Sequence, residues 1–480
     1  YSYMEIDNIN RETERPIQFP VKDNGRFKIA NQKDFEKIPG SPIGYWVSDS
    51  FINIFDKNEQ LNKKLDIKQG LATGNNLRFL RVWNEIELSK IGLKFESIKH
   101  AHISGKKWFP YNKGGGFRKW YGYQEYLISF DLVNYDTLLS VGNHLPSRNY
   151  YFKESITWGL ISSKSFSPRY SPKGFVFDVV GSSGFSDVNL YYKLSLLCSK
   201  ISAEALRIFN PTLSFQVGDI KQIPYVENNV DIINNISSNC IKISKTDWDS
   251  RETSWDFQQN ELIRCKSNCG QNCADLDLLS NEDRDEILGM ARIPTNSNLL
   301  EDCYEAYKSK WTKMFFQLHQ NEEELNRQFI EIYGLQDELT PDVPLEEITI
   351  LQEETSIENG ELVFHADEVF AQFVSYAVGC MFGRYSLDKE GLILANQGET
   401  LQDYLEKVGR GEEELTFAPD RDNIIPVLDD EWFRDDIVER FHTFLKASFG
   451  EQNFRKNLDF VEECLGKDIR KYFTRDFYKD

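Results

Sequence analysis

Gly174-Phe-Val-Phe-Asp-Val-Val180, followed at residues 188–209 by apolar side chains three or four positions apart, decides the fold class of the first half of the chain. The first stretch is rich in β-branched and aromatic residues and starts at a glycine, which is typical of a short strand. Tyr126-Leu-Ile-Ser-Phe130 has the same character. The second stretch predicts one helical face, formed by Leu190, Leu194, Leu197, Ile201, Ala205 and Ile208. We therefore predict an α+β domain.

The second half of the chain is dominated by helical spacing. From Tyr304 the apolar positions follow a helical period and stop at Gly334, a residue suited to the left-handed position after a helix. Asp367 can cap a further helix that contains Val369 and Met381. Helices are expected at residues 230–244, 304–333, 367–381, 430–449 and 451–465. The predicted C-terminal region is therefore mainly α-helical.

These patterns divide the chain into four parts. We assign residues 1–34 to a polar lead-in, 35–226 to the α+β domain, 227–300 to a helical spacer with a polar excursion, and 301–480 to an acidic helical domain. The chain opens with Tyr-Ser-Tyr-Met-Glu, which is neither a secretory signal nor a natural start, so we expect it to be a piece of a longer protein.

Composition limits the class of protein. A hydrophobic content of 40% in 480 residues excludes wholesale disorder. The longest uncharged apolar stretch covers residues 369–383, which is shorter than the roughly 18 to 20 residues of a membrane span. The 8 cysteines follow no repeating framework, and they indicate a reducing cytoplasm. We expect a cytoplasmic protein without a membrane partner.

Charge separates the two halves. Residues 1–250 hold 32 Lys and Arg against 26 Asp and Glu, a net charge of +6, whereas residues 251–480 hold 24 against 50, a net charge of −26. Within the first half, residues 51–200 carry 21 basic and 12 acidic side chains. The local field at a contact surface, more than the overall charge of −20, decides whether phosphates are attracted. A basic region inside an acidic protein is thus open to a polyanionic partner.

The densest candidate site is the segment from Lys99 to Tyr123, where six Lys and Arg alternate with seven aromatic residues. Cations neutralise phosphates, a glycine run lets the backbone approach a ligand closely, and aromatic rings stack on bases. The alternative is a solvated basic hairpin whose aromatic residues are core. The segment supplies these candidates: Lys106, Lys107, Tyr111, Asn112, Lys113, Arg118, Lys119 and Trp120.

Two shorter clusters extend the candidate set. Gly70 to Arg81 is a glycine-bounded polar loop followed by two arginines, and a tight strand-to-helix turn without a ligand explains it about as well. Ser167 to Gly174 places two cations on a proline-stiffened loop before a strand. Their candidate residues are Thr73, Asn75, Asn76, Arg78 and Arg81 in the first, and Arg169 and Lys173 in the second.

Metal and catalytic sites are not indicated. His100 and His102 are expected to share a strand face, but no third ligand is suitably spaced. Cys265, Cys269 and Cys273 have gaps that structural zinc uses, yet a fourth ligand is lacking nearby, so three free thiols are the preferred interpretation. The sequence contains no Gly-x-Ser-x-Gly nucleophile motif and no Walker phosphate loop. We predict no catalytic and no metal-binding residue.

Several stretches together resemble the C-terminal half of the PglX family, the adenine-specific DNA methyltransferases of BREX phage-defence systems. They include Gly70-Leu-Ala-Thr-Gly-Asn-Asn76, Lys107-Trp-Phe-Pro-Tyr-Asn-Lys-Gly-Gly115, Arg169-Tyr-Ser-Pro-Lys-Gly-Phe-Val-Phe-Asp178, Glu252-Thr-Ser-Trp-Asp-Phe257 and Gly379-Cys-Met-Phe-Gly-Arg-Tyr-Ser-Leu-Asp388. The resemblance spans most of the chain. In that family an upstream half binds S-adenosylmethionine and holds the flipped adenine with an Asn-Pro-Pro-Tyr motif, a tetrapeptide that this sequence lacks.

The resemblance implies a target-recognition domain, similar to the specificity domains of TaqI-like methyltransferases and of type I restriction specificity subunits. It implies no cofactor in this chain, S-adenosylmethionine being held upstream, and it implies double-stranded DNA and the upstream methyltransferase domain as partners. Phosphate contacts are expected from Arg78, Arg81, Lys106, Lys107, Lys113 and Lys119, and base contacts from Asn75, Asn112, Arg118 and Arg169.

The acidic half predicts contacts with proteins, including other BREX proteins, because a surface of its charge does not attract DNA. An alternative function follows from the same charge: a regulatory module whose acidic face mimics DNA and occupies another protein. An autonomous nuclease is a third hypothesis, but it needs a carboxylate or histidine cluster that the sequence does not show.

Overall fold

A computed structural model describes residues 31–162, 164–210, 214–267 and 297–479, together with positions 9, 10, 13, 15, 16, 29 and 212. A mixed first part with small sheets is followed by a largely helical region, which confirms the predicted fold class. Within the described residues no helix combines the length and the apolar character needed to cross a membrane.

Short helices and strands alternate in the first part. Its helices are α1 (Gln32–Phe35), α2 (Asp49–Lys57), α3 (Asn76–Phe79), α4 (Ile98–Ile103), α5 (Leu132–Ser140), α6 (Leu190–Cys198), α7 (Lys200–Phe209) and α8 (Val217–Ile220). Its strands are β1 (Ile9–Asn10), β2 (Arg15–Pro16), β3 (Glu59–Gln60), β4 (Asp66–Lys68), β5 (Leu80–Val82), β6 (Trp108–Asn112), β7 (Tyr126–Ser129), β8 (Ser155–Thr157), β9 (Arg169–Ser171), β10 (Val176–Phe177), β11 (Ser183–Phe185) and β12 (Pro224–Tyr225).

Two four-stranded sheets organise these strands. One has the order β10-β6-β7-β5, in which only β10 and β6 run parallel, so β5 is an edge strand. The other has the order β4-β11-β8-β9 and is antiparallel throughout. Isolated bridges from Leu71 to Asp178 and from Trp120 to Arg169 continue the pairing beyond the strands. The two-stranded pairs β1-β2 and β12-β3 complete the first part.

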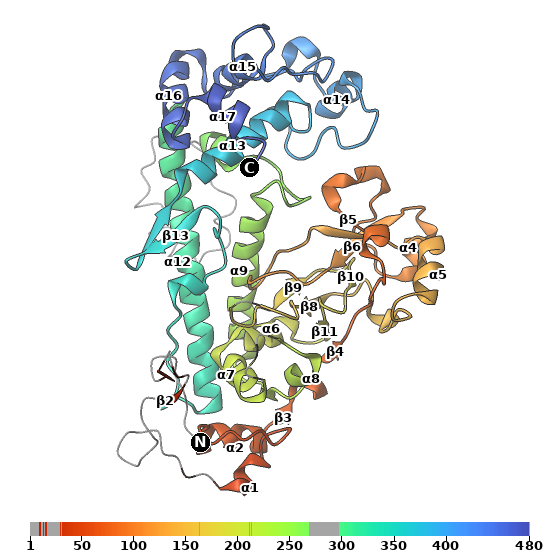
Figure 1. Ribbon diagram of the computed structural model, residues 1–480, viewed down its shortest axis with the longest axis vertical. Helices are drawn as coiled ribbons and strands as arrows, with labels where there is room; N and C mark the ends of the chain where they lie inside the picture. The colour runs from red at the N-terminus through yellow and green to blue at the C-terminus, as the bar shows by residue number, and fades with distance from the viewer. Residues whose placement is uncertain are drawn as a thin grey trace.

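Long helices dominate the rest of the chain. They are α9 (Val230–Asp249), α10 (Glu261–Ser267), α12 (Leu300–Tyr333), α13 (Ala366–Met381), α14 (Leu401–Val408), α15 (Ile437–Phe449), α16 (Phe454–Leu465) and α17 (Ile469–Arg475), with a hairpin of β13 (Thr355–Glu358) and β14 (Glu361–Phe364). Gly334 ends α12 with φ of 66°, as its sequence position predicted. In Figure 1, α9 and α12 run along the long axis, the sheets lie to one side, and α13 to α17 gather at the top.

Some local predictions were wrong. The helical face predicted across residues 188–209 belongs to two helices, because Ser199 is extended with ψ of 163°. The Lys200 amide at the start of α7 donates to the Asn326 side chain of α12 at 2.9 Å, a partner that local sequence cannot reveal. His100 and His102 lie on α4, not on a strand. Asp367 lies in the first turn of α13, whose cap position is His365.

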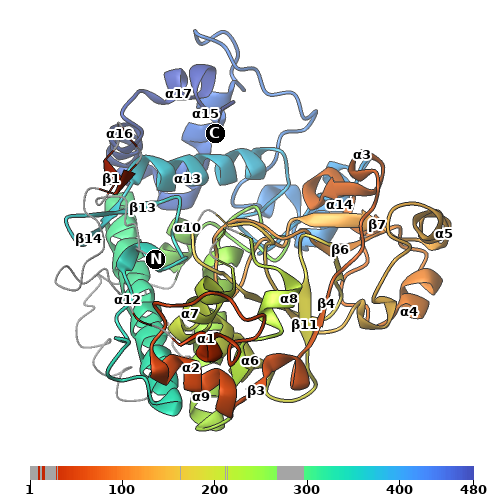
Figure 2. The ribbon, with the colours of Figure 1, turned by 60° about the horizontal axis from the view of Figure 1, so that its bottom comes forward.

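The main apolar core continues across residue 226. It runs from Ile38 to Phe473 and joins α2, α6 and α7 of the first part to α9, α12, α13, α15 and α16. Figure 2 shows α6, α7 and α9 gathered together beside β4 and β11. A smaller core lies within the β5–β7 sheet and its helices α4 and α5, around Phe109, Phe130 and Phe152. The first part therefore has its own small core and also shares the large one.

A second contact joins the segment after β5 to the connections that follow α9 and α13. The Trp83 indole N–H donates to the Thr253 carbonyl at 2.8 Å, and the Arg384 guanidinium lies 5.5 Å from the centre of the Trp83 ring. Desolvation raises the pKa of the neighbouring Glu252 carboxyl above its ordinary value, against hydrogen bonds to Ser375 and Tyr385 that lower it. A carboxyl is thus held beside the junction in surroundings that favour its protonated form.

This carboxyl gives the protein a pH-dependent stability. Because the pKa of Glu252 is raised on folding, its stabilising contribution is complete below the unfolded pKa and is lost as the pH rises through the folded one. We expect Glu252→Gln to raise the free energy of unfolding at neutral pH and to bring little change near pH 4. Urea denaturation across this pH range measures the difference, and a gain that is larger in acid than at neutral pH would contradict the assignment.

Candidate nucleic-acid interface

The loop before α3 is held by its own polar side chains. The Thr73 hydroxyl donates to Asn76 Oδ1 at 2.6 Å, and Asn75 Oδ1 accepts from the Arg78 amide at 3.1 Å, which caps α3. Asn143 braces the loop from the α5 side, since it accepts from the Ala72 amide at 2.8 Å. The polar atoms that the sequence suggested for DNA therefore build the turn, while the arginines that follow it project from α3 and β5.

Arg81 and Lys107 flank Trp108, Arg78 lies on the neighbouring helix α3, and we call these four residues the basic cluster. Arg81 Cζ and Lys107 Nζ lie 5.8 and 5.6 Å from the centre of the Trp108 ring. Arg81 donates to the carbonyls of Leu77 and Leu80 at 2.7 and 2.6 Å, which fixes its guanidinium beside α3. Arg78 Cζ lies 4.9 Å from the Phe79 ring. The cluster unites α3, the edge strand β5 and the start of β6.

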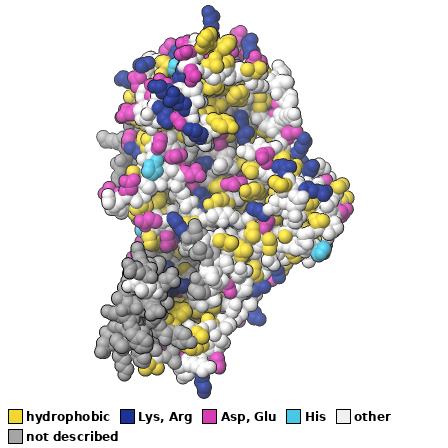
Figure 3. Space-filling view, viewed as in Figure 1, with side chains coloured by type: hydrophobic (Ala, Val, Ile, Leu, Met, Phe, Trp, Pro, Cys, Tyr) yellow, Lys and Arg dark blue, Asp and Glu magenta, His cyan; other side chains and the backbone are white. Residues whose placement is uncertain are grey.

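The cations of the basic cluster have no acidic partner within 4.0 Å among the described side chains. Arg78 and Lys107 are exposed and Arg81 is half-buried. Leu77, between the two loop asparagines and the arginines, is 89% exposed at the tip of α3. Figure 3 shows Lys and Arg side chains interspersed with hydrophobic ones over this part of the molecule. Guanidinium and ammonium groups that have no acidic partner and lie at the surface can bind the phosphate backbone of a nucleic acid.

Other predicted contacts are already engaged within the protein. Lys113 pairs with the buried Asp178 at 2.8 Å, and the Tyr111 hydroxyl donates to the same carboxylate at 2.6 Å. Burial first, and then Asp178, raises the pKa of Tyr111 well above its ordinary value. Three further predicted DNA contacts also have partners within the protein. Asn112 donates to Ser171 at 2.8 Å, Lys173 pairs with Glu96 at 2.9 Å, and Lys106 donates to the Ser89 carbonyl.

Arg118, Lys119 and Trp120 point into the helical region. Arg118 is 5% exposed, and its Nη2 lies 2.6 Å from Asp247 Oδ2 of α9. Lys119 Nζ lies 2.6 Å from Glu322 of α12, and the Trp120 indole donates to the other oxygen of that carboxylate at 2.8 Å. The basic, aromatic stretch that suggested a DNA surface therefore attaches the sheets to α9 and α12. In this arrangement its cations face carboxylates of the protein instead of phosphates.

The partners of Asp247 and Lys119 at this junction favour the charged form of each side chain. Burial would raise the pKa of Asp247, but Arg251 and Arg118 outweigh it and lower the pKa. Burial likewise opposes the charge of Lys119, and Glu322 outweighs it and raises the pKa of the ammonium. Arg251 extends the network, since it lies 2.6 Å from Glu354 beside β13. Two sets of buried charge pairs thus hold the junction, one on α9 and one on α12.

Arg169 is buried without a carboxylate partner. It is 1% exposed, and its guanidinium donates to the carbonyls of Gly114 and Arg118 at 2.5 and 3.2 Å, with the Tyr123 ring 5.0 Å away. Burial lowers its pKa to about 10. The side chain thereby fixes the course of residues 114–118 from within, and it presents no donor to a duplex in this conformation.

Sequence reasoning missed the acidic partners Asp247 and Glu322, although each left a signal. The apolar face of α9 contains Ile233, Cys240 and Ile243, and Asp247 falls on the same face. Glu322 lies between buried residues of α12 in the same way. A charged residue on an apolar helical face needs a buried partner of opposite charge. The basic segment from Lys99 to Tyr123 supplies these partners.

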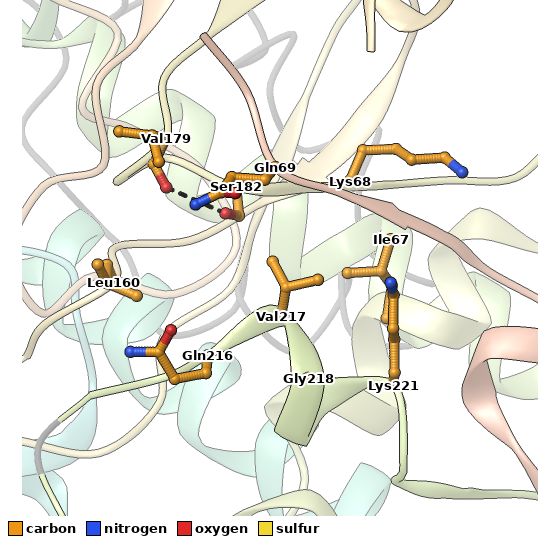
Figure 4. Close-up of a pocket in the computed structure, with 10 residues that line it drawn as sticks. All are labelled: Ile67, Lys68, Gln69, Leu160, Val179, Ser182, Gln216, Val217, Gly218 and Lys221. Carbon is orange, nitrogen blue, oxygen red and sulfur yellow. Dashed lines mark hydrogen bonds between the residues drawn. The ribbon is translucent and has the colours of Figure 1, made fainter. Parts of the chain in front are cut away.

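Metal ligands and cavities are the remaining features that could form a site. They contain no group of three or more His, Cys, Asp or Glu side chains that could hold a metal ion. Cys265 is described, whereas Cys269 and Cys273 lie outside the described residues. A cavity of about 370 Å³ lies between β4 and α8, and the Ser182 hydroxyl in its lining donates to the Val179 carbonyl at 3.2 Å (Figure 4). Its polar lining also includes Lys68, Gln69, Gln216 and Lys221.

Two curated proteins match the chain along nearly its whole length. The adenine-specific methyltransferase PglX of Lacticaseibacillus casei (strain Zhang) is 34% identical over 467 residues, which is 93% of this chain and 35% of the relative. The adenine-specific methyltransferase BrxX of Escherichia coli O9:H4 (strain HS) is 33% identical over 476 residues, which is 95% of this chain and 36% of the relative. The chain is homologous to a region of PglX and BrxX.

The homology with PglX and BrxX extends over the sheets and the helical region alike, because it covers more than nine tenths of the chain. The chain spans about a third of the length of these curated relatives. No protein-family model matches it. The resemblance inferred from sequence stretches is thereby supported as homology to adenine-specific methyltransferases.

Proposed function

We propose that this chain is the DNA-recognition part of an adenine-specific methyltransferase of the PglX type, acting in BREX phage defence. It binds double-stranded DNA and selects the site at which N6 of an adenine is methylated. Another region of the methyltransferase binds S-adenosylmethionine and performs the transfer. The observation that carries this proposal is the basic cluster, whose three cations pair with no described carboxylate, on a homologue of two adenine-specific methyltransferases.

The basic cluster suits a duplex backbone. Arg78 and Arg81 present planar forks that bind phosphate oxygens, and Lys107 adds a point charge next to them. The rings beside these cations, Trp108 and Phe79, are buried, so the charges are held on a rigid support. Methylation of a duplex base requires that the base leave the stack, and a recognition surface must hold the duplex while this happens. Phosphate contacts from the basic cluster would hold the duplex in place.

The proposal is tested by duplex binding across salt concentrations. We expect the variant Arg78→Gln/Arg81→Gln/Lys107→Gln to bind a labelled duplex more weakly than the unmodified chain at low salt. Each lost phosphate contact lowers the slope of log affinity against log salt by about 0.9, so the triple variant should lower it by about 2 to 3. Fluorescence anisotropy between 50 and 300 mM salt measures the slope.

The matched control removes three cations elsewhere. Arg327→Gln/Arg455→Gln/Lys471→Gln changes the net charge equally, on exposed faces of α12, α16 and α17. If binding depends on overall charge alone, both triple variants lose the same slope, and the basic cluster is not the DNA surface. Binding that neither variant changes has the same consequence. The DNA-mimic alternative predicts instead no duplex affinity at all and a protein partner that DNA displaces.

A further inference from the structure

The segment between α14 and α15 exposes an unusual amount of apolar surface. We call residues 420–436 the Trp432 segment. Trp432 is 76% exposed and Phe433 53%, and Ile424, Val427 and Leu428 are 68%, 48% and 37% exposed. Single exposed apolar residues are ordinary, but a contiguous group with a tryptophan indicates a contact site. Figure 2 shows the connection between α14 and α15 reaching out beyond the helices at the upper edge of the molecule.

The Trp432 segment is fixed at both ends. The Arg470 guanidinium of α17 donates to the Leu428 carbonyl at 3.1 Å and to the Asp436 carboxylate at 2.8 Å, so one side chain closes the base of the loop that carries Trp432 and Phe433. Asp436 is fully buried and caps α15 by accepting from the Glu439 amide at 2.9 Å. At the other end the Asp420 amide donates to the Met381 carbonyl at 2.7 Å.

This fixation lowers the cost of binding. A flexible loop loses conformational entropy when it docks, whereas a loop that is already closed at its base loses less. Trp432 and Phe433 are aromatic side chains with few rotatable bonds, and such residues dominate the binding energy of protein interfaces. The segment thus presents Trp432 and Phe433 on a loop that loses little conformational entropy on binding.

Charge narrows the class of partner. Apart from the buried Asp436, the Trp432 segment contains six Asp and Glu against two Arg, and one of these arginines, Arg421, already pairs with Glu412. Asp429, Asp430 and Glu431 directly precede the aromatic pair. Such a surface repels DNA and acidic proteins, and it complements a surface rimmed by Lys and Arg.

We propose that the Trp432 segment docks a separate protein whose surface combines an apolar pocket with a basic rim. Trp432 and Phe433 enter the pocket, and the acidic residues beside them contact the rim. The basic cluster and the Trp432 segment then engage different macromolecules, DNA on the sheets and a protein at the helical region. This docking does not depend on the proposed DNA contacts, and it is tested by separate experiments.

The partner is identified by cross-linking and verified with purified components. The photoreactive residue benzoylphenylalanine replaces Phe433 in the full-length protein in its host cells, and the cross-linked product is identified by mass spectrometry. The identified protein is then purified and titrated with this chain between 50 and 300 mM salt. We expect one distinct protein, with the cross-link on a surface that contains Lys or Arg, and an affinity that falls as salt rises.

Three variants test the contact itself. Trp432→Ala/Phe433→Ala should weaken the purified complex at least tenfold, because buried aromatic anchors contribute most of the energy. Asp429→Asn/Asp430→Asn/Glu431→Gln should flatten the salt dependence. The control Ile103→Ala/Val133→Ala removes two apolar residues elsewhere, 73% and 71% exposed, and should leave the affinity unchanged. A missing cross-link, a cross-link only to DNA or to a second copy of the chain, or an affinity that the aromatic variant leaves intact would overturn the proposal.

Discussion

Asp247→Ala is expected to lower the free energy of unfolding by about 3 to 5 kcal/mol, because it leaves two buried guanidinium groups without their carboxylate. Asp247 is fully buried between Arg118 at 2.6 Å and Arg251 at 3.0 Å. It also accepts from the Leu351 amide at 3.0 Å, so the connection after α12 loses a partner as well. Urea denaturation monitored by tryptophan fluorescence measures the loss, since Trp248 lies beside Arg118.

An exposed ion pair provides the comparison. Arg455 and Asp459 on α16 are 77% and 56% exposed at a distance of 3.1 Å, and Asp459→Ala should lower the stability by about 1 kcal/mol or less. Asp247→Asn keeps the shape of the side chain and should fall between the two alanine variants. If Asp247→Ala has no larger effect than Asp459→Ala, the junction between the sheets and α9 does not depend on this carboxylate.

Gly70→Ala is the second change with a large expected effect. A Cβ atom at position 70 would lie 2.1 Å from the Phe177 carbonyl oxygen and 2.6 Å from that of Asp178, and both are backbone atoms. The backbone must therefore shift where the Leu71 amide donates to Phe177 at 3.0 Å. Overpacking of this kind costs about 1 to 3 kcal/mol and occasionally more, and we expect the upper part of the range.

The same substitution at Gly218 is the control. Gly218 lies in α8 with no atom within 4 Å of an added Cβ, so Gly218→Ala should leave stability unchanged or raise it by about 0.4 to 1 kcal/mol. Thermal denaturation distinguishes the two variants. Gly70→Ala should also weaken duplex binding, because the displaced loop carries α3 and Arg78. Equal melting temperatures for the two variants would show that the loop before α3 yields without strain.

The helices were predictable because their signals are local. The period of apolar residues that ends at Gly334 marks α12, and the cap at that glycine has the backbone conformation that its position predicted. The broken pattern at Ser199 was not predictable, since a side chain of α12 stabilises the start of α7 from 126 positions away. Local sequence thus predicts that a helix forms. It does not predict where tertiary packing divides one helical stretch into two helices.

The candidate site was predictable only in part. Arg78, Arg81 and Lys107 could be proposed from composition, and the structure places Arg81 and Lys107 around one indole ring with Arg78 on the adjoining helix α3. Arg118 and Lys119 lie in a similar basic and aromatic stretch, yet they pair with carboxylates 129 and 203 positions away in the same chain. A cation that is destined for phosphate and one that is destined for a carboxylate of the same chain look alike in sequence. Only the tertiary arrangement distinguishes them.

The inward-facing cations have a practical consequence for truncation. A protein ending near residue 226 would lack α9 and α12, and Arg118, Lys119 and Trp120 would lose Asp247 and Glu322 and become solvent-accessible. Such a fragment would acquire an artificial polyanion-binding patch of two cations and an indole. Its affinity for DNA, heparin or RNA would then report a surface that the intact chain does not possess. Point variants in the undivided chain avoid this artefact.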